Sequence, residues 1–277
     1  MTPPPRILAI AGSDSSGGAG IQADIKTITM LGGYAMTAIT AVTAQNTVGV
    51  QAVEVLPVEL VVAQIESCLS DIGVDAIKIG MLGSAAIAHA VADLLEPLDI
   101  PPVFDPVMIA TNGAELADEE TIEAFERLMA LSFLTTPNHP ELERLGGQDD
   151  ARWKTANLLV TGGHAEGPEI ENLLLTPTGE WSFWVRRVET LHTHGTGCTL
   201  SAAIATGIGA GLALEVAVDR AIRFIEMALI HAPGFGAGHG PMGHALGRVP
   251  FYDALAAIDT QGFDARAHAA KWDQEYS

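Results

Sequence analysis

Short apolar runs rich in β-branched residues alternate along most of this chain with longer runs of helical character. Residues 7–11 have the composition of a buried strand, and residues 19–31 follow with apolar side chains at three- and four-residue spacing. The pattern continues to two Ala-rich helical runs at residues 197–210 and 214–232. The two periodicities are typical of strands and of helices with one apolar face. Their repeated alternation predicts an α/β fold with a mainly parallel central sheet.

The ends of the expected strands predict where a ligand binds. Ligands of parallel α/β sheets lie beyond the carboxyl ends of the strands. We therefore expect one rim to carry the polar and glycine residues that follow the strand-like runs, namely Gly12, Gln45, Gly80, Met81, Asp105, Pro106, Asn138, Gly162 and Gly163. Residues 171–187 interrupt the alternation, and Thr178 and Gly179 at their centre indicate a β-hairpin.

The organisation of the chain predicts one main domain. No low-complexity linker or internal repeat divides it, and 48% apolar residues suffice for a core on both faces of a sheet. We expect this domain to span residues 1–248. The run FYDALAAI, which begins at Phe251, has amphipathic spacing. It predicts that residues 249–277 form a C-terminal helical extension packed on the same domain.

Charge and cysteine content restrict the partners and the compartment. A net charge of −20 argues against nucleic acid or an anionic membrane as a partner, and any phosphate must be attracted by local groups. Two cysteines are too few for a disulfide framework and suit a reducing cytosol. No apolar run approaches the length of a signal peptide core or a membrane span. We expect a cytoplasmic protein.

The loop after the first expected strand carries glycines at positions 12, 17, 18 and 20, in an arrangement that holds phosphate in many proteins. A P-loop is excluded because Gly18 and Ala19 stand where lysine and Ser/Thr are required. A dinucleotide fingerprint is disfavoured because no acidic residue closes the following strand. We expect the loop's backbone amides and Asp24 to hold a small polar substrate, the alternative being a turn that only packs helix on strand.

Gly195, Thr196 and Gly197 form the better phosphate cradle, since they precede a helix rich in small residues. Cys198 follows in the first helical turn, where the positive helix end is expected to lower the thiol pKa below about 8.5. Such a thiolate deprotonates an alcohol or attacks a carbonyl; the alternative is a small buried residue, the role that we assign to Cys68. His192 and His194 precede Cys198 at a spacing that matches no standard zinc site.

Eight short motifs occur in an order that resembles the hydroxymethylpyrimidine/phosphomethylpyrimidine kinases of thiamine biosynthesis, within the ribokinase-like superfamily. They are AGSDSSGGAGIQAD, TAVTAQNT, IKIGML, FDPVM, TPNHPE, GGH, HGTGCTLSAA and GHGP. The resemblance covers about Arg6 to His244. It implies a three-layer α/β/α sandwich without the large lid of the sugar kinases, use of ATP and Mg²⁺, and a homodimer.

The resemblance also implies roles for individual residues. The pyrimidine lies among Gly12, Asp24, Gln45, Met81 and Val107, with Gln45 pairing to the ring nitrogen and amino group. The terminal phosphates of ATP lie over Gly195, Thr196 and Gly197, and Cys198 is the base where most of the superfamily has aspartate. The nucleotide contacts Asn138, Glu141, Thr161 and Gly163, and Asp105 and Glu141 support magnesium.

Two departures from the family pattern bear on ATP. Thr161 stands in TGGH where the family commonly has a lysine that reaches toward the phosphates. The connection from His139 to Asn157 is about a dozen residues shorter than usual, so we expect it to lose helical cover near the nucleotide.

The leading hypothesis is ATP-dependent phosphorylation of 4-amino-5-hydroxymethyl-2-methylpyrimidine and of its monophosphate. Pyridoxal or pyridoxine kinase activity is the enzymatic alternative, because that ring is similar in size and carries a hydroxymethyl group. Thr161 and the short connection support a further alternative, a pyrimidine-binding protein with weakened catalysis. A dinucleotide-dependent oxidoreductase is the least supported alternative.

Overall fold

The computed structural model describes residues 3–109, 113, 116–163 and 167–249. Its nine-stranded sheet has the order β3-β2-β1-β4-β5-β6-β7-β8-β9. The pairs from β2 through β1, β4, β5 and β6 to β7 are parallel, which confirms the predicted α/β fold. The strands are β1 (Arg6–Asp14), β2 (Tyr34–Gln45), β3 (Val50–Val55), β4 (Ala76–Ile79), β5 (Pro102–Phe104), β6 (Leu134–Thr135), β7 (Leu158–Val160), β8 (Glu169–Thr176) and β9 (Gly179–Arg186).

Antiparallel strands lie at both ends of the sheet. β3 pairs with β2 after a short turn, because a connection of so few residues is too short for a parallel crossover. β8 and β9 form the predicted hairpin, in which Thr176 pairs with Gly179, and β8 also pairs antiparallel with β7.

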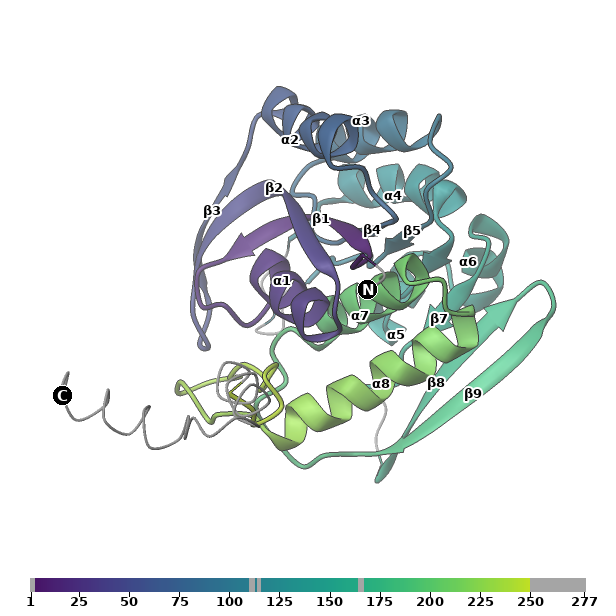
Figure 1. Cartoon of the computed structure of the whole chain (residues 1–277). Coiled ribbons are helices and arrows are strands. Elements are labelled where there is room, and N and C mark those ends of the chain that lie inside the picture. The colour runs from purple at the N-terminus through teal and green to yellow at the C-terminus, as the bar shows by residue number, and fades with distance from the viewer. Residues whose placement is uncertain (1–2, 110–112, 114–115, 164–166, 250–277) are drawn as a thin grey trace, which may run out of the picture. The chain divides into compact units, whose positions relative to one another are not determined.

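Helices cover both faces of the sheet (Figure 1). The first strand shows why: Leu8 and Ile10 point into one apolar core, whereas Ile7, Ala9 and Ala11 point into the other. α2 (Val58–Asp71), α3 (Ala85–Leu95) and α4 (Glu119–Leu131) pack on the first core. α1 (Gly20–Met30), α7 (Thr196–Gly209) and α8 (Leu214–Ile230) pack on the second.

The connection from residue 139 to residue 157 contains two short helices, α5 (His139–Arg144) and α6 (Gln148–Lys154). The expectation that this segment loses its helical cover is therefore wrong. Asn138 begins α5 with a capping box, in which its side chain accepts from the Glu141 N–H and the Glu141 carboxylate accepts from the Asn138 N–H. These reciprocal bonds satisfy two donors that a six-residue helix otherwise leaves unpaired.

The chain separates into a compact unit at residues 1–244 and a second unit at residues 245–277. The predicted helix that starts at Phe251 lies outside the described residues. Within the described part of the chain, no helix is both long and apolar enough to cross a membrane.

Candidate active site

A cavity of about 690 Å³ opens at the carboxyl edge of the parallel strands. Residues at the ends of β1 and β2, and residues that follow β4, β5, β6 and β7, line it together with the first turn of α7. The structure thus brings together nearly all the residues that the sequence singled out, namely Gly12, Gln45, Met81, Asp105, Val107, Asn138, Glu141, Thr161, Gly163, Gly195, Thr196, Gly197 and Cys198. Among the residues expected to contact a ligand, Asp24 is the exception.

Asp24 lies in α1 and is fully buried rather than in the cavity wall, contrary to the prediction that it contacts substrate. Its Oδ2 forms an ion pair with Lys78 Nζ at 3.0 Å, and both side chains are completely inaccessible to solvent. Burial raises the pKa of the Asp24 carboxyl to about 6 even though the Lys78 ammonium opposes the change. Lys78 was not predicted as part of the site, because a lysine inside the strand-like run DAIKIG gives no sign that it is buried.

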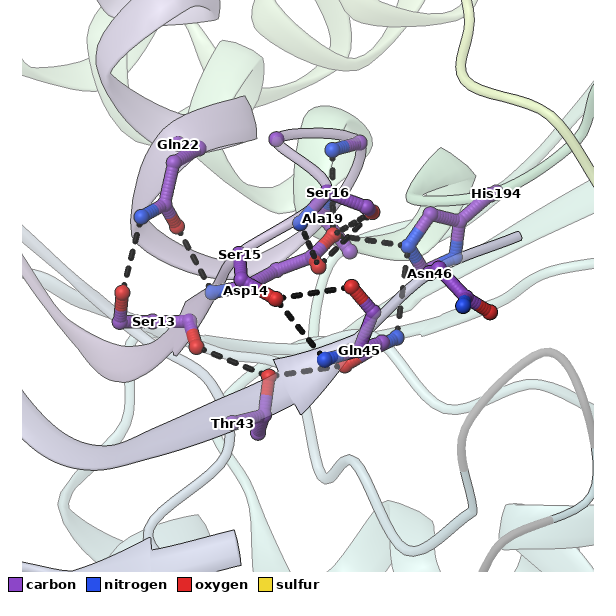
Figure 2. A network of polar contacts seen from close by, with 12 residues as sticks. Ser13, Asp14, Ser15, Ser16, Ala19, Gln22, Thr43, Gln45, Asn46 and His194 are labelled. Atoms are coloured by element: carbon purple, nitrogen blue, oxygen red, sulfur yellow. Dashed lines mark hydrogen bonds and ion pairs between the residues drawn. The ribbon is translucent and has the colours of Figure 1, made fainter. Parts of the chain in front are cut away.

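The glycine loop between β1 and α1 is organised around Asp14 (Figure 2). The Asp14 carboxylate accepts hydrogen bonds from the N–H groups of Ser16, Gly18 and Ala19 at 2.9, 3.0 and 2.8 Å. The Gly17 N–H donates to the Asp14 carbonyl at 3.0 Å. The amides of residues 16–19 therefore do not hold substrate as expected, because the loop's own aspartate already engages them.

Gln45 ends β2 beside this loop, as the sequence predicted. Its main chain is tied to Ser15, whose hydroxyl donates to the Gln45 carbonyl at 2.8 Å and accepts from the Gln45 N–H at 2.8 Å. The side-chain amide borders the cavity and lies near Thr43 and His194. The amide is therefore fixed at its base and accessible at its tip.

The phosphate cradle has the predicted geometry of a glycine turn before a helix. Gly195 begins α7 with a φ of 86°, in the left-handed region that favours glycine. The first hydrogen bond of the helix runs from the Thr199 N–H to the Gly195 carbonyl, so the N–H groups of Gly197 and Cys198 precede it. Because both residues line the cavity, this helix end offers donors and positive potential to an anion.

Cys198 borders the cavity, but its electrostatic surroundings differ from the prediction. Although the side chain is only half-buried by surface area, the atoms around its sulfur desolvate it and raise the thiol pKa to about 12. The Lys78 ammonium and a hydrogen bond from the Gly20 N–H oppose this rise, whereas Asp24 and Asp105 add to it. The predicted lowering of the pKa is therefore wrong, and the thiol is neutral in the ligand-free site.

Two carboxylates face the cavity from β5 and α5. Burial raises the pKa of Asp105 to about 6, against the opposing effect of Lys78. Burial raises the pKa of Glu141 to about 8, and repulsion from Asp105 adds to it. Among the described residues, no group of three or more His, Cys, Asp or Glu side chains is arranged to hold a metal ion. A cation bound here would have these two carboxylates as protein ligands and would take its other ligands from substrate or water.

Arginines supply positive charge on the side of the cavity that carries Thr161. Arg187 follows β9, lines the cavity, and donates from Nη1 to the Gly163 carbonyl at 3.1 Å. Its Nε donates to the Gly167 carbonyl at 2.8 Å. This guanidinium therefore lies on the same turn as the threonine that replaces the expected lysine. The sequence signal was an Arg-Arg pair in a chain with only 14 Lys and Arg residues.

Comparison with known proteins identifies the family. A family model described as phosphomethylpyrimidine kinase matches residues 14–243. The chain belongs to the phosphomethylpyrimidine kinase family. A hydroxymethylpyrimidine/phosphomethylpyrimidine kinase of Streptomyces coelicolor is 43% identical over 262 residues, which cover 88% of this chain and 96% of that protein. The thiamine biosynthesis multifunctional protein ThiED of Corynebacterium efficiens is 42% identical over 258 residues, 87% of this chain but only 35% of that longer protein.

Solved structures of this family and of pyridoxal kinases share the fold. Phosphomethylpyrimidine kinase from Clostridium difficile 630 is 37% identical with a TM-score of 0.70, over 80% of this chain and 98% of that chain. Pyridoxal kinase from Staphylococcus aureus in complex with ADP is 29% identical with a TM-score of 0.80, over 89% of this chain and 96% of that chain. The assignment of this chain to the phosphomethylpyrimidine kinase family therefore rests on sequence similarity, and the pyridoxal kinases are structural relatives.

Proposed function

We propose that this protein transfers the γ-phosphoryl group of ATP to the hydroxymethyl group of 4-amino-5-hydroxymethyl-2-methylpyrimidine, and then phosphorylates the resulting monophosphate. One observation carries the proposal: a single cavity joins an amide side chain suited to a pyrimidine edge, Gln45, to an anion cradle at the start of α7. Cys198 borders the cavity at the cradle. Phosphoryl transfer depends mainly on this kind of positioning and on charge stabilisation.

On the pyrimidine side, Gln45 pairs with a ring nitrogen and the exocyclic amino group, and Gly12, Met81 and Val107 contact the ring. A Cβ on Gly12 would lie 2.9 Å from the Met81 sulfur, so any larger residue would require the Met81 side chain to shift. Asp24 is buried beneath the cavity and acts on the site indirectly, through its ion pair with Lys78.

On the nucleotide side, the turn formed by Gly195, Thr196 and Gly197 receives the terminal phosphates, with the N–H groups of Gly197 and Cys198 as donors, since the Thr196 N–H already donates to the Thr193 carbonyl. Asn138 and Thr161 lie together there, because the Thr161 N–H donates to the Pro137 carbonyl at 3.0 Å. Gly163 lines the same wall, and Arg187 supplies the cation that Thr161 does not. An arginine fork suits phosphate oxygens well.

Magnesium fits the two carboxylates of the cavity. Asp105 and Glu141 would hold it, since Mg²⁺ prefers oxygen ligands and is often bound by one or two carboxylates together with substrate phosphates. When bound, the ion neutralises phosphate charge. Glu141 has a pKa raised partly by Asp105, which indicates a like-charge repulsion that a divalent cation relieves.

The alcohol proton must leave as the new phosphate ester forms, and we propose Cys198 as its acceptor. Lys78 and the Gly20 N–H favour the thiolate form there. Because the resting thiol carries its own proton, Cys198 must first release that proton to solvent, and the resulting thiolate accepts the alcohol proton late in a loose transition state.

The finer architecture, assembly and location are also proposed from the resemblance. Helices on both faces of the sheet support a three-layer α/β/α sandwich without a large lid. Residues 1–248 form the proposed kinase domain. The homodimer is proposed from the resemblance alone, and two free cysteines suit the reducing cytoplasm.

The test is phosphoryl transfer by the purified protein, with ATP–Mg²⁺ and either the pyrimidine or pyridoxal as acceptor. We expect both phosphorylations of the pyrimidine, and a kcat/KM for the pyrimidine well above that for pyridoxal. Gln45→Ala weakens pyrimidine binding by about 1–3 kcal/mol and leaves ATP binding intact, because it unpairs buried polar groups of one ligand only. Tight pyrimidine binding without transfer would establish a binding protein, and preference for pyridoxal would reverse the substrate assignment.

A further inference from the structure

The Asp14–His194 pair connects two glycine segments that are 180 residues apart in the sequence. His194 Nε2 lies 2.8 Å from Asp14 Oδ2, and both side chains are almost completely buried. Asp14 holds the glycine loop on the pyrimidine side, whereas His194 immediately precedes Gly195 in the phosphate cradle. Figure 2 shows the imidazole reaching the carboxylate that organises the loop.

The two glycine segments also touch through their backbones. A Cβ on Gly195 would lie 1.9 Å from the Gly18 carbonyl oxygen, and a Cβ on Gly18 would lie 2.5 Å from His194 Cδ2. No side chain fits between them, so a shift of one segment displaces the other. Such a contact transmits position but not orientation, which requires a directional bond.

The Asp14 carboxylate is fully engaged on the loop side. It accepts from three backbone N–H groups and from the Ser16 hydroxyl, and hydrogen bonds from His194, Ser16 and Ala19 outweigh burial to hold its pKa below the usual value. A permanently charged carboxylate at this point fixes where the imidazole lies. The His194 main chain is held as well, since its N–H donates to the Gly240 carbonyl at 3.2 Å.

The same imidazole supports the side chain that is proposed to read the pyrimidine. Gln45 Nε2 lies 3.4 Å from His194 Nε2, on the cavity side of the pair; because this nitrogen donates its proton to the Asp14 carboxylate, the amide packs against the ring without a hydrogen bond to it. Asp14, His194 and Gln45 therefore form a continuous series of contacts that joins the glycine loop, the phosphate cradle and the Gln45 side-chain amide. Three parts of the site meet at one ring.

We propose that Asp14 and His194 are positioning residues that hold the pyrimidine loop and Gln45 in register with the phosphate cradle. This inference rests on the proposed function, because the register matters for an alcohol and a phosphoryl group that must meet in line. Displacement of reacting groups by about 1 Å reduces the rate by roughly 100-fold even when both ligands still bind. The pair therefore acts on kcat and on the coupling between the two ligands, rather than on the binding of either ligand alone.

The test compares His194→Met with His194→Gln, because the glutamine amide can still donate to Asp14 at nearly the position of the imidazole Nε2. His192→Met is the matched control, since His192 lies two residues earlier and does not line the cavity. Turnover, calorimetric dissociation constants for the pyrimidine and for AMP-PCP–Mg²⁺, and the midpoint of thermal unfolding are measured for each.

We expect His194→Met to lower kcat by roughly 10- to 100-fold while each dissociation constant changes by less than about threefold. His194→Gln should recover most of the rate, and His192→Met should resemble the wild type. Asp14→Asn should show the same loss of kcat; if it does not fold, the His194 variants decide alone. Normal turnover of His194→Met, or a loss that follows ligand affinity or unfolding temperature, overturns the inference, as does failure of glutamine to rescue.

A wild-type protein without transfer would refute the proposed function but not the pair. The inference is then judged by calorimetry, where pyrimidine should bind more tightly with AMP-PCP–Mg²⁺ present and His194→Met should abolish that difference. Equal pyrimidine affinity with and without the analogue in the wild type overturns the inference.

Discussion

Lys78→Met removes the cation from a buried ion pair and leaves the Asp24 carboxyl without it. Both side chains are completely buried, their charged atoms are 3.0 Å apart, and Asp24 Oδ1 has no other hydrogen-bond partner. Breaking such a pair typically lowers the free energy of unfolding by about 3–5 kcal/mol, because an uncompensated charge remains inside. We expect a loss of this size at about pH 7.5, measured by urea unfolding.

The loss of unfolding free energy in Lys78→Met should be smaller at low pH, because the protonation of Asp24 sets its pH dependence. Its pKa is already about 6 with Lys78 present, and removal of the ammonium raises it further above the unfolded value of about 3.9. The folded variant thus binds a proton more tightly than the unfolded chain. The penalty is present above the folded pKa and is lost as the pH falls through it, so the loss at about pH 5 should be smaller than at about pH 7.5.

Two further variants define the result. Lys78→Met with Asp24→Leu should regain most of the stability, since apolar replacement of a whole buried pair is often neutral. Lys154→Met removes a surface lysine paired with Glu126 and Asp150, and should change the unfolding free energy by only about 0–1 kcal/mol. A loss under about 1 kcal/mol for Lys78→Met at both pH values would refute the reasoning, because it would mean that the pair contributes no more than a surface one.

The remaining predictions concern Cys198 and the nucleotide side of the cavity. Cys198→Ser should reduce kcat by about 10²- to 10⁴-fold with both ligands still bound, the usual contribution of a general base, and normal turnover would exclude that role. Alkylation of wild-type Cys198 by iodoacetamide near neutral pH should be slow because burial raises its pKa to about 12, and rapid labelling would contradict this. Arg187→Met should raise the KM for ATP by about tenfold through loss of a charge-assisted contact, and leave the KM for the pyrimidine unchanged. Thr161→Lys added to Arg187→Met should restore part of the lost ATP affinity. Arg152→Met, outside the cavity on α6, should leave the KM for ATP unchanged. An unchanged KM for ATP in Arg187→Met would exclude Arg187 from the nucleotide site.

Local patterns predicted the elements of the fold because their causes are local. Ser84 accepts from the Ile87 N–H at the start of α3, as its position before an apolar helical run predicts. Asp118 does the same for α4, ahead of two acidic residues in the first turn. The short connection at residues 139–157 was misjudged, because comparing its length with the family ignored the capping box that lets α5 form in six residues.

The rim residues were also predictable, since parallel strands end at a common edge and the residues after them must meet there. The sequence by itself determined this edge, the glycine turn before α7 and the polar residues that face the cavity. Their protonation and partners were decided only by the tertiary structure. Cys198 has the sequence position of an activated thiol, but desolvation and the neighbouring carboxylates raise its pKa. Asp24 has the position of a substrate ligand, but it lies beneath the cavity with Lys78, and Asp14 meets a histidine 180 residues away. Solvation and long-range pairing depend on which elements pack together, and one-dimensional spacing carries no record of either.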